Sequence, residues 1–114
     1  MDKSGTLLNK VNVLGVEYAI IEASKNDNES LAENDGLCDT STKMCYVEEM
    51  KYEPGMKKNL KDYKKQVIRH ELIHAFLYES GLDVCSWANN EELVDWIAIQ
   101  FPKMMKTFKE ADCV

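Results

Sequence analysis

The longest stretch without a helix breaker runs from about Asn59 to Ser80, and it constrains the fold of this chain most. Gly81 follows at the place where a glycine commonly ends a helix. At 100° per residue, the apolar residues of this stretch point almost all round the helix axis; they are Val67, Ile68, Leu72, Ile73, Ala75, Phe76 and Leu77. A helix that is apolar on every side packs other elements on two faces. We therefore predict a central, buried helix over residues 59–80.

The residues before this helix indicate β-strands. Residues 10–14 alternate between polar and apolar, Gly15 breaks the pattern, and residues 17–22 are rich in β-branched and aromatic side chains. Residues 24–36 are polar without periodicity, which predicts a long exposed connection with a helical turn around Leu31. Residues 37–39 and 44–47 flank a polar tetrapeptide and predict a hairpin, and Pro54-Gly55 interrupts the chain before the helix.

A second helix is predicted to begin near Asn89 or Asn90, because both are good N-cap residues and two carboxylates follow in the first turn. Its apolar face consists of Leu93, Val94, Ile97, Ala98 and Phe101. Pro102 is expected to break or kink it before one more short amphipathic piece with Met104, Met105 and Phe108. Strands first and helices afterwards predict an α+β fold, in which a small antiparallel sheet packs on the central helix and the second helix.

Length and charge narrow the classes of function. A chain of 114 residues corresponds to one domain, residues 1–114. The 14 basic and 20 acidic residues give a net charge of -6, which disfavours general binding to nucleic acids. No apolar run approaches the roughly 20 residues of a membrane span, and the first residues lack the apolar core of a secretory signal. We therefore expect a cytoplasmic protein whose cysteines are free thiols.

One motif carries recognisable chemistry. His70-Glu71-Leu72-Ile73-His74 is an HExxH sequence inside the predicted central helix. The spacing of four residues puts both imidazoles on one helix face, close enough to hold one Zn²⁺. Two unpaired imidazoles on an apolar helix would be costly, which also favours a metal. Glu71 would then be the general base that acts on water.

A catalytic zinc needs a third protein ligand, and the start of the second helix offers candidates. HExxH followed by Asn90-Glu91 and Asp95 resembles the gluzincin arrangement of thermolysin-type peptidases, which is HExxH plus NExxxD. The resemblance implies that Glu91 is the third ligand and that Asp95 orients a ligand histidine. Because predicted helix starts are uncertain by a residue or two, Glu92 is a competing ligand, and Cys85 is a further alternative.

Residues 70–102 also resemble the short ImmA/IrrE-type metallopeptidases of mobile elements, through Asp95-Trp96-Ile97-Ala98 and Pro102. Together with the order of strands, hairpin and helices, this resemblance implies a minimal zincin-like metallopeptidase encoded by a phage or prophage. Such a protein would act in the host cytoplasm. By analogy its substrate would be a cytosolic regulatory protein.

Two functions are compatible with these residues. The first is a zinc-dependent peptidase, which would bind an extended peptide along a sheet edge. Thermolysin-type enzymes also use a third histidine to stabilise the oxyanion, but this chain has only two histidines. A tyrosine would have to stabilise the oxyanion instead, and the candidates are Tyr46, Tyr63 and Tyr78. The second is a non-catalytic zinc-binding module that docks on a host or phage protein.

Basic residues gather on the predicted central helix, at helix-wheel angles opposite the histidines. They are Lys57, Lys58, Lys61, Lys64, Lys65 and Arg69. A charge run of this kind is usually a solvated face. We therefore expect these side chains to lie in solvent, away from the metal site.

Overall fold

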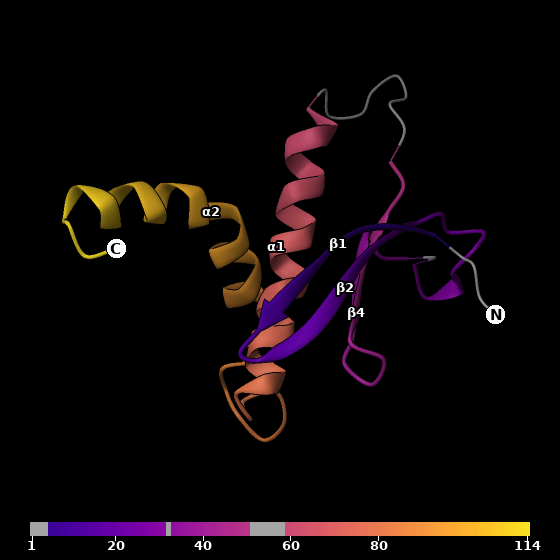
Figure 1. The fold of residues 1–114 in the computed structure, drawn as a ribbon, viewed down its shortest axis with the longest axis horizontal. Coiled ribbons are helices and arrows are strands. Elements are labelled where there is room, and N and C mark those ends of the chain that lie inside the picture. Colours follow the sequence, from indigo (N-terminus) through magenta and orange to yellow (C-terminus); the bar gives the residue numbers. More distant parts are fainter. Residues whose placement is uncertain (1–4, 32, 51–58) are drawn as a thin grey trace.

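The computed structural model describes residues 5–31, 33–50 and 59–114. The expected features at Pro54-Gly55, Lys57 and Lys58 lie outside these residues. The elements are β1 (Thr6–Val13), β2 (Val16–Ala23), a 3-10 turn η1 (Glu29–Leu31), β3 (Gly36–Asp39), β4 (Met44–Glu48), α1 (Leu60–Glu79) and α2 (Glu91–Glu110). The strands form one sheet that lies beside α1, with α2 on another side of α1 (Figure 1). The predicted α+β class is confirmed.

The sheet has the strand order β1-β2-β4-β3. The pairs β1–β2 and β3–β4 are antiparallel, but β2 and β4 run parallel, so the sheet is mixed and not wholly antiparallel as expected. The parallel pairing arises because β4, and not β3, lies next to β2. Strand β4 is apolar along most of its length and buries Cys45 and Val47, so it takes the interior position of the sheet and leaves β3 at the edge.

The connections follow the sequence signals closely. Leu14 and Gly15, between β1 and β2, have positive φ angles of 53° and 93°, which a tight hairpin turn requires. The helical turn expected around Leu31 is η1, and Leu31 itself is fully buried. In the β3–β4 turn the Asp39 carboxylate accepts hydrogen bonds from Ser41, which lower the pKa of Asp39.

Helix α1 matches its predicted range. Asn59 caps its start by accepting a hydrogen bond from the backbone of Asp62, Ser80 caps its end, and Gly81 has a positive φ of 78°. The sheet and α2 cover two of its faces, as predicted. The prediction of full burial was wrong, because the elements in the described part of the chain leave one side of α1 uncovered. Phe76, on that side, is 43% exposed.

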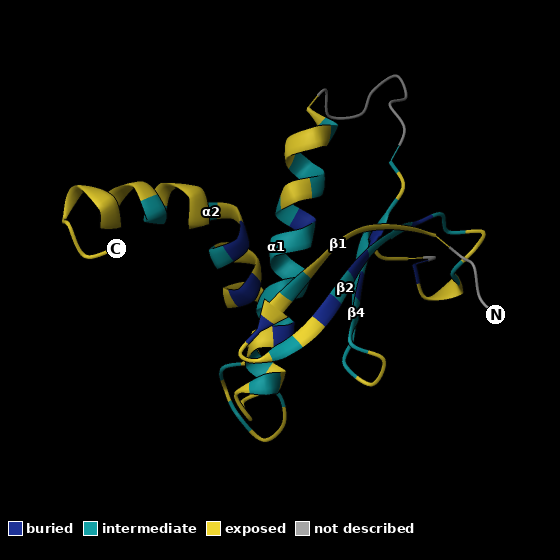
Figure 2. Cartoon of the chain, viewed as in Figure 1, coloured by how far each residue is buried: buried dark blue, intermediate teal, exposed yellow. Residues whose placement is uncertain are grey.

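Helix α2 runs through Pro102 without ending, so Met104 and Phe108 belong to the same helix. Its axis nevertheless changes direction, and its C-terminal half extends away from the sheet and is largely exposed (Figures 1 and 2). Proline has no N–H to donate to the carbonyl four residues earlier, which is that of Ala98, and such a loss bends helices. Neither helix in the described ranges has an apolar stretch long enough to span a membrane.

Arg69 supplies the missing donor for the bend in α2. Its Nε donates a hydrogen bond of 2.7 Å to the Ala98 carbonyl oxygen. The expectation that Arg69 lies on a solvated basic face was therefore wrong, as it was for Lys64, which pairs with Glu22 on β2. Both side chains reach across to neighbouring elements, because α1 is covered on more than the face that carries the histidines.

Candidate metal centre

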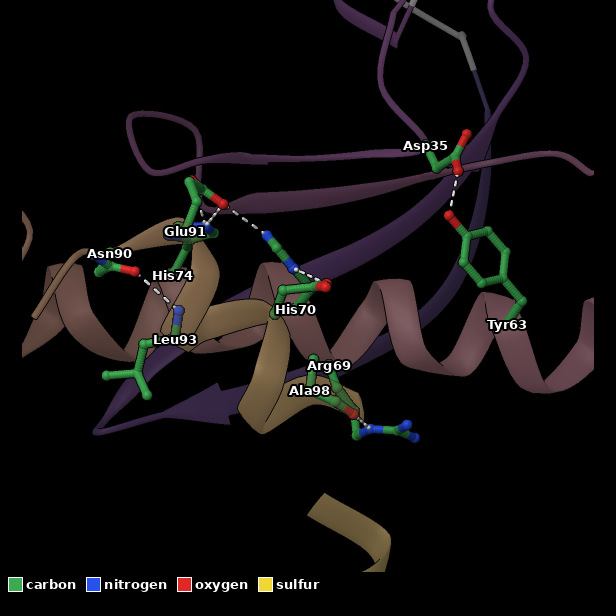
Figure 3. Close-up of polar contacts among 10 residues, drawn as sticks. Asp35, Tyr63, Arg69, His70, His74, Asn90, Glu91, Leu93 and Ala98 are labelled. Carbon is green, nitrogen blue, oxygen red and sulfur yellow. Dashed lines mark hydrogen bonds and ion pairs between the residues drawn. The ribbon is translucent and has the colours of Figure 1, made fainter. Parts of the chain in front are cut away.

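The two histidines of the HExxH motif lie one turn apart on α1. Their ring centroids are 5.0 Å apart, and both rings face the first turn of α2 (Figure 3). Both side chains are mostly covered by their neighbours. The helix geometry expected from the spacing of His70 and His74 is thus present.

Glu91, the first residue of α2, extends its carboxylate between the two imidazoles. His70 Nε2 lies 3.0 Å from Glu91 Oε1, and His74 Nε2 lies 3.0 Å from Glu91 Oε2. The side chain of Asn90 caps the helix by accepting a hydrogen bond of 3.0 Å from the Leu93 backbone (Figure 3). This cap determines where α2 begins and therefore which way Glu91 points.

The three side chains of this triad, His70, His74 and Glu91, could hold a metal ion. One ligand atom from each residue lies within 4.8 Å of the others. Ligands at about 2.0–2.1 Å from a tetrahedral zinc are about 3.3 Å from one another, close to the observed nitrogen–oxygen separations. The Glu91 side chain is 72% exposed, so the group is open to solvent on one side.

The competing ligands lie elsewhere. Glu92 lines an apolar hollow on another face of α2, together with Trp87, Leu93 and Trp96. Cys85 is an exposed residue of the loop between the helices and does not belong to the triad. Of the three candidates, the structure brings Glu91 alone to the two histidines.

Asp95 lies one turn after Glu91 and contacts the other nitrogen of the first imidazole. Its Oδ1 is 3.1 Å from His70 Nδ1. If Nε2 bound a metal ion, Nδ1 would carry the proton and would donate it to Asp95, an arrangement that is usual around metal-bound histidines. Of its neighbours on the predicted apolar face, Val94 and Ala98 are buried but Leu93 is exposed, and the Asp95 side chain itself is 52% exposed. Burial therefore does not force Asp95 to pair with His70.

Glu71 lies beside the triad and beneath strand β3. Burial raises the pKa of its carboxyl, while the two histidines act in the opposite direction. A Cβ atom at Gly36 would lie 2.9 Å from Glu71 Oε2 and 2.6 Å from a methyl group of Val67. The absence of a side chain at Gly36 therefore allows the strand to cover Glu71 closely.

Two adjoining hollows, of about 330 and 360 Å³, open beside the triad. Gly36, His70, Glu71 and Glu91 line both of them. Their other wall follows the chain from Asn34 through β3, the edge strand of the sheet. The candidate site is thus a trough between the edge of the sheet and the two helices.

Of the three tyrosines considered for the oxyanion, Tyr63 lines this trough. Its hydroxyl donates to the Asp35 carboxylate, and this hydrogen bond together with burial raises the pKa of Tyr63 to about 12 (Figure 3). The Tyr78 ring lies under the Lys43 ammonium, and the Tyr46 hydroxyl contacts the Met44 sulfur.

Sequence reasoning missed the roles of Asp35 and Gly36. Both belong to Asn34-Asp35-Gly36, which resembles an ordinary turn signal, so nothing local distinguished them from surface residues. Their importance arises from packing against α1, two dozen or more residues further along the chain.

The chain matches no protein-family model, no curated protein and no solved structure. The site contains a His-His-Glu group that could hold a metal ion, next to a glutamate whose pKa is raised by burial.

Proposed function

We propose that this protein is a zinc-dependent metallopeptidase that hydrolyses peptide bonds. The observation that carries the proposal is the convergence of His70, His74 and Glu91, with Glu71 directly beside them in the same trough. These three residues would hold the ion. When bound to such a set of ligands, Zn²⁺ lowers the pKa of water towards 7 and polarises carbonyl groups.

Glu71 would act as the general base. It would accept a proton from the attacking water and then deliver that proton to the leaving amine. Its raised pKa supports this role, because a carboxyl group that is easier to protonate is a better proton carrier near neutral pH. Its position under β3 also keeps it beside any substrate that lies along that strand.

Asp95 and Tyr63 would assist the reaction. Asp95 would hold His70 in one tautomer and orientation through their hydrogen bond. Tyr63 would turn its hydroxyl from Asp35 to the developing oxyanion of the substrate carbonyl. A tyrosine phenol keeps its proton throughout the neutral range, so the hydroxyl would be able to donate to the oxyanion.

The substrate would be a peptide in an extended conformation. It would add to the outer edge of β3, which is an edge strand of the sheet in the described residues. Backbone groups there would provide hydrogen bonds without regard to sequence. The motif resemblance makes a cytosolic regulatory protein the proposed target of an enzyme encoded by a mobile element. The net charge of -6 supports a protein substrate over a nucleic acid.

A non-catalytic zinc-binding module that docks on another protein is the second candidate. Two observations favour it: both histidines of the chain belong to the triad, and the Tyr63 hydroxyl is already bonded to Asp35. A zinc site without oxyanion support would bind but not cleave.

The deciding experiment combines zinc analysis with a cleavage assay on a mixture of unfolded peptides, read by mass spectrometry. Under the peptidase proposal, the wild-type protein binds stoichiometric zinc and cleaves, whereas Glu71→Gln binds zinc and does not cleave. Glu92→Gln, the same change on an exposed neighbour outside the triad, should retain both properties.

Equal cleavage by wild type and Glu71→Gln would contradict the role of Glu71. Stoichiometric zinc in both proteins with no cleavage by either would favour the docking module. Failure of the wild type to bind zinc would overturn both functions.

A further inference from the structure

Two cysteines lie opposite each other on the β3–β4 hairpin. Cys38 and Cys45 are paired in register, and their sulfur atoms are 3.8 Å apart, as free thiols. A disulfide requires about 2.05 Å between sulfurs and about 4.4–6.8 Å between Cα atoms. The two sulfur atoms therefore need to approach each other by less than 2 Å, while the two residues are already opposite each other on paired strands.

The hydrogen-bonding pattern of the hairpin favours formation of a disulfide between Cys38 and Cys45. The Glu48 amide donates to the Asp35 carbonyl, which makes these two residues a hydrogen-bonded pair of the antiparallel ladder. Such pairs alternate with non-hydrogen-bonded ones, and by this alternation Cys38 and Cys45 form a non-hydrogen-bonded pair. At these positions the Cα atoms are only about 4.5 Å apart and the side chains are closest.

The two thiols differ in access to solvent. Cys45 is buried in the core next to Tyr18 and Ala75. Cys38 is partly exposed and lines the larger of the two hollows beside the triad. A small oxidant that enters the trough therefore reaches Cys38 first, with a second thiol directly behind it.

We propose that Cys38 and Cys45 form an oxidation site that takes hydroperoxides and closes an intrachain disulfide. The Cys38 sulfur attacks one oxygen of hydrogen peroxide, the O–O bond breaks, and Cys38 becomes a sulfenic acid while its thiol proton leaves with the other oxygen as water. The Cys45 sulfur then attacks the Cys38 sulfur, the S–O bond breaks, and the hydroxide leaves with the Cys45 thiol proton as the second water. Two thiols are oxidised to one disulfide and one peroxide is reduced to two waters.

The disulfide would join the edge strand β3 to β4 in the wall of the trough, next to Glu71. The step uses sulfur atoms outside the His-His-Glu triad, so it does not depend on bound metal or on peptidase activity. It can therefore be tested separately from the proposed function.

The test uses the full chain with Cys85→Ser and Cys113→Ser, which removes the two exposed thiols and keeps the pair. After treatment with hydrogen peroxide, we expect the intact mass to fall by two hydrogen atoms. Both thiols should become unreactive towards an alkylating agent in denaturant, and dithiothreitol should restore both. The same chain carrying Cys38→Ser as well is the matched control and should show no such loss of mass.

The proposal would be overturned by two alkylatable thiols after peroxide, by addition of oxygen atoms without loss of two hydrogens, or by a disulfide that links two chains. Closure that is no faster in the folded protein than in guanidinium would also overturn it, since the pairing in the hairpin would then contribute nothing.

Discussion

At the scale of single residues, Glu91 and Glu92 are chemically identical neighbours with different surroundings. They project from α2 about 100° apart. That rotation directs Glu91 to the histidines and Glu92 to the hollow beside Trp87. Position on the helix, and not residue type, therefore separates a candidate ligand from an ordinary surface carboxylate.

This difference predicts unequal effects of two matched substitutions. Glu91→Ala should weaken zinc binding by more than about 100-fold, because it removes one of three ligands. Glu92→Ala should leave zinc affinity unchanged within a factor of about three and lower stability by about 0.3–1 kcal/mol, as a lost carboxylate at a helix N-terminus. Competition with a chromophoric chelator measures the affinities, and the reverse order would assign the ligand to Glu92.

Asp95 acts on the proposed site through His70. Asp95→Asn should keep the fold, because the side chain is half exposed, and should lower zinc affinity or turnover by about 10–100-fold. Asp112→Asn, the same change on an exposed aspartate after α2, is the control and should have no effect on zinc. Equal zinc affinities for the two variants would show that the His70–Asp95 contact does not support the site.

At the scale of elements, two close contacts hold the strand and the helices around the site. Arg69 on α1 satisfies the carbonyl that Pro102 leaves without its helical partner, so the bend in α2 is tied to α1 next to His70. Gly36 on β3 lies against Val67 and Glu71 of α1. The three elements meet where the candidate ligands lie.

Gly36→Ala should disturb the packing of β3 against α1. The new methyl group would overlap Val67 and the Glu71 carboxylate, and overpacking of this kind costs about 1–3 kcal/mol. Peptidase activity, if present, should fall because Glu71 is displaced. Chemical denaturation and the cleavage assay measure the two effects.

Val67→Ala provides the control for that prediction, because it removes the methyl group nearest to the new side chain. The double variant should be more stable than the sum of the two single changes implies, whereas its activity should stay low. Additive losses of stability within about 0.5 kcal/mol would mean that Gly36 and Val67 do not interact.

At the scale of the whole molecule, a polar cluster joins the sheet to the end of α1. The Tyr18 hydroxyl and the Lys43 ammonium each donate 2.7 Å hydrogen bonds to the Glu79 carboxylate. Tyr18 is fully buried, and its pKa is raised by burial and by Glu79. The cluster lets the sheet bury a tyrosine against α1 with its hydroxyl satisfied.

The Glu79 carboxylate predicts a pH dependence of stability. The hydrogen bonds from Lys43 and then from Tyr18 lower its pKa below the ordinary 4.5. Its stabilising contribution is therefore complete above the unfolded-state pKa and is lost as the pH falls through the lower folded-state pKa. Glu79→Gln should have a lower Tm than wild type at pH 7, and the difference should shrink as the solution is acidified below pH 4.5.

Glu110→Gln, at the exposed end of α2, is the control for this prediction, and its Tm should follow the wild type at every pH. A difference between Glu79→Gln and wild type that is constant from neutral to acidic pH would show that the charge of Glu79 does not stabilise the fold.

The sequence by itself determined the features that depend on local pattern. The unbroken stretch to Ser80 predicts α1, and the cap residues Asn89 and Asn90 predict the start of α2 to within a residue. The break at Gly15 separates the first two strands. These predictions succeed because periodicity and capping act within a few residues. The spacing of His70 and His74 likewise puts both rings on one face of α1. The α+β class follows from the order of these elements.

Only the tertiary structure decided which elements meet. The parallel pairing of β2 with β4, the position of Gly36 over Glu71 and the bond from Arg69 to α2 all join segments that are distant in the chain. The choice of Glu91 over Glu92 also depends on how α2 is rotated against α1. Local patterns describe the faces of one element, whereas the pairing of faces depends on how all the apolar surfaces pack together at once.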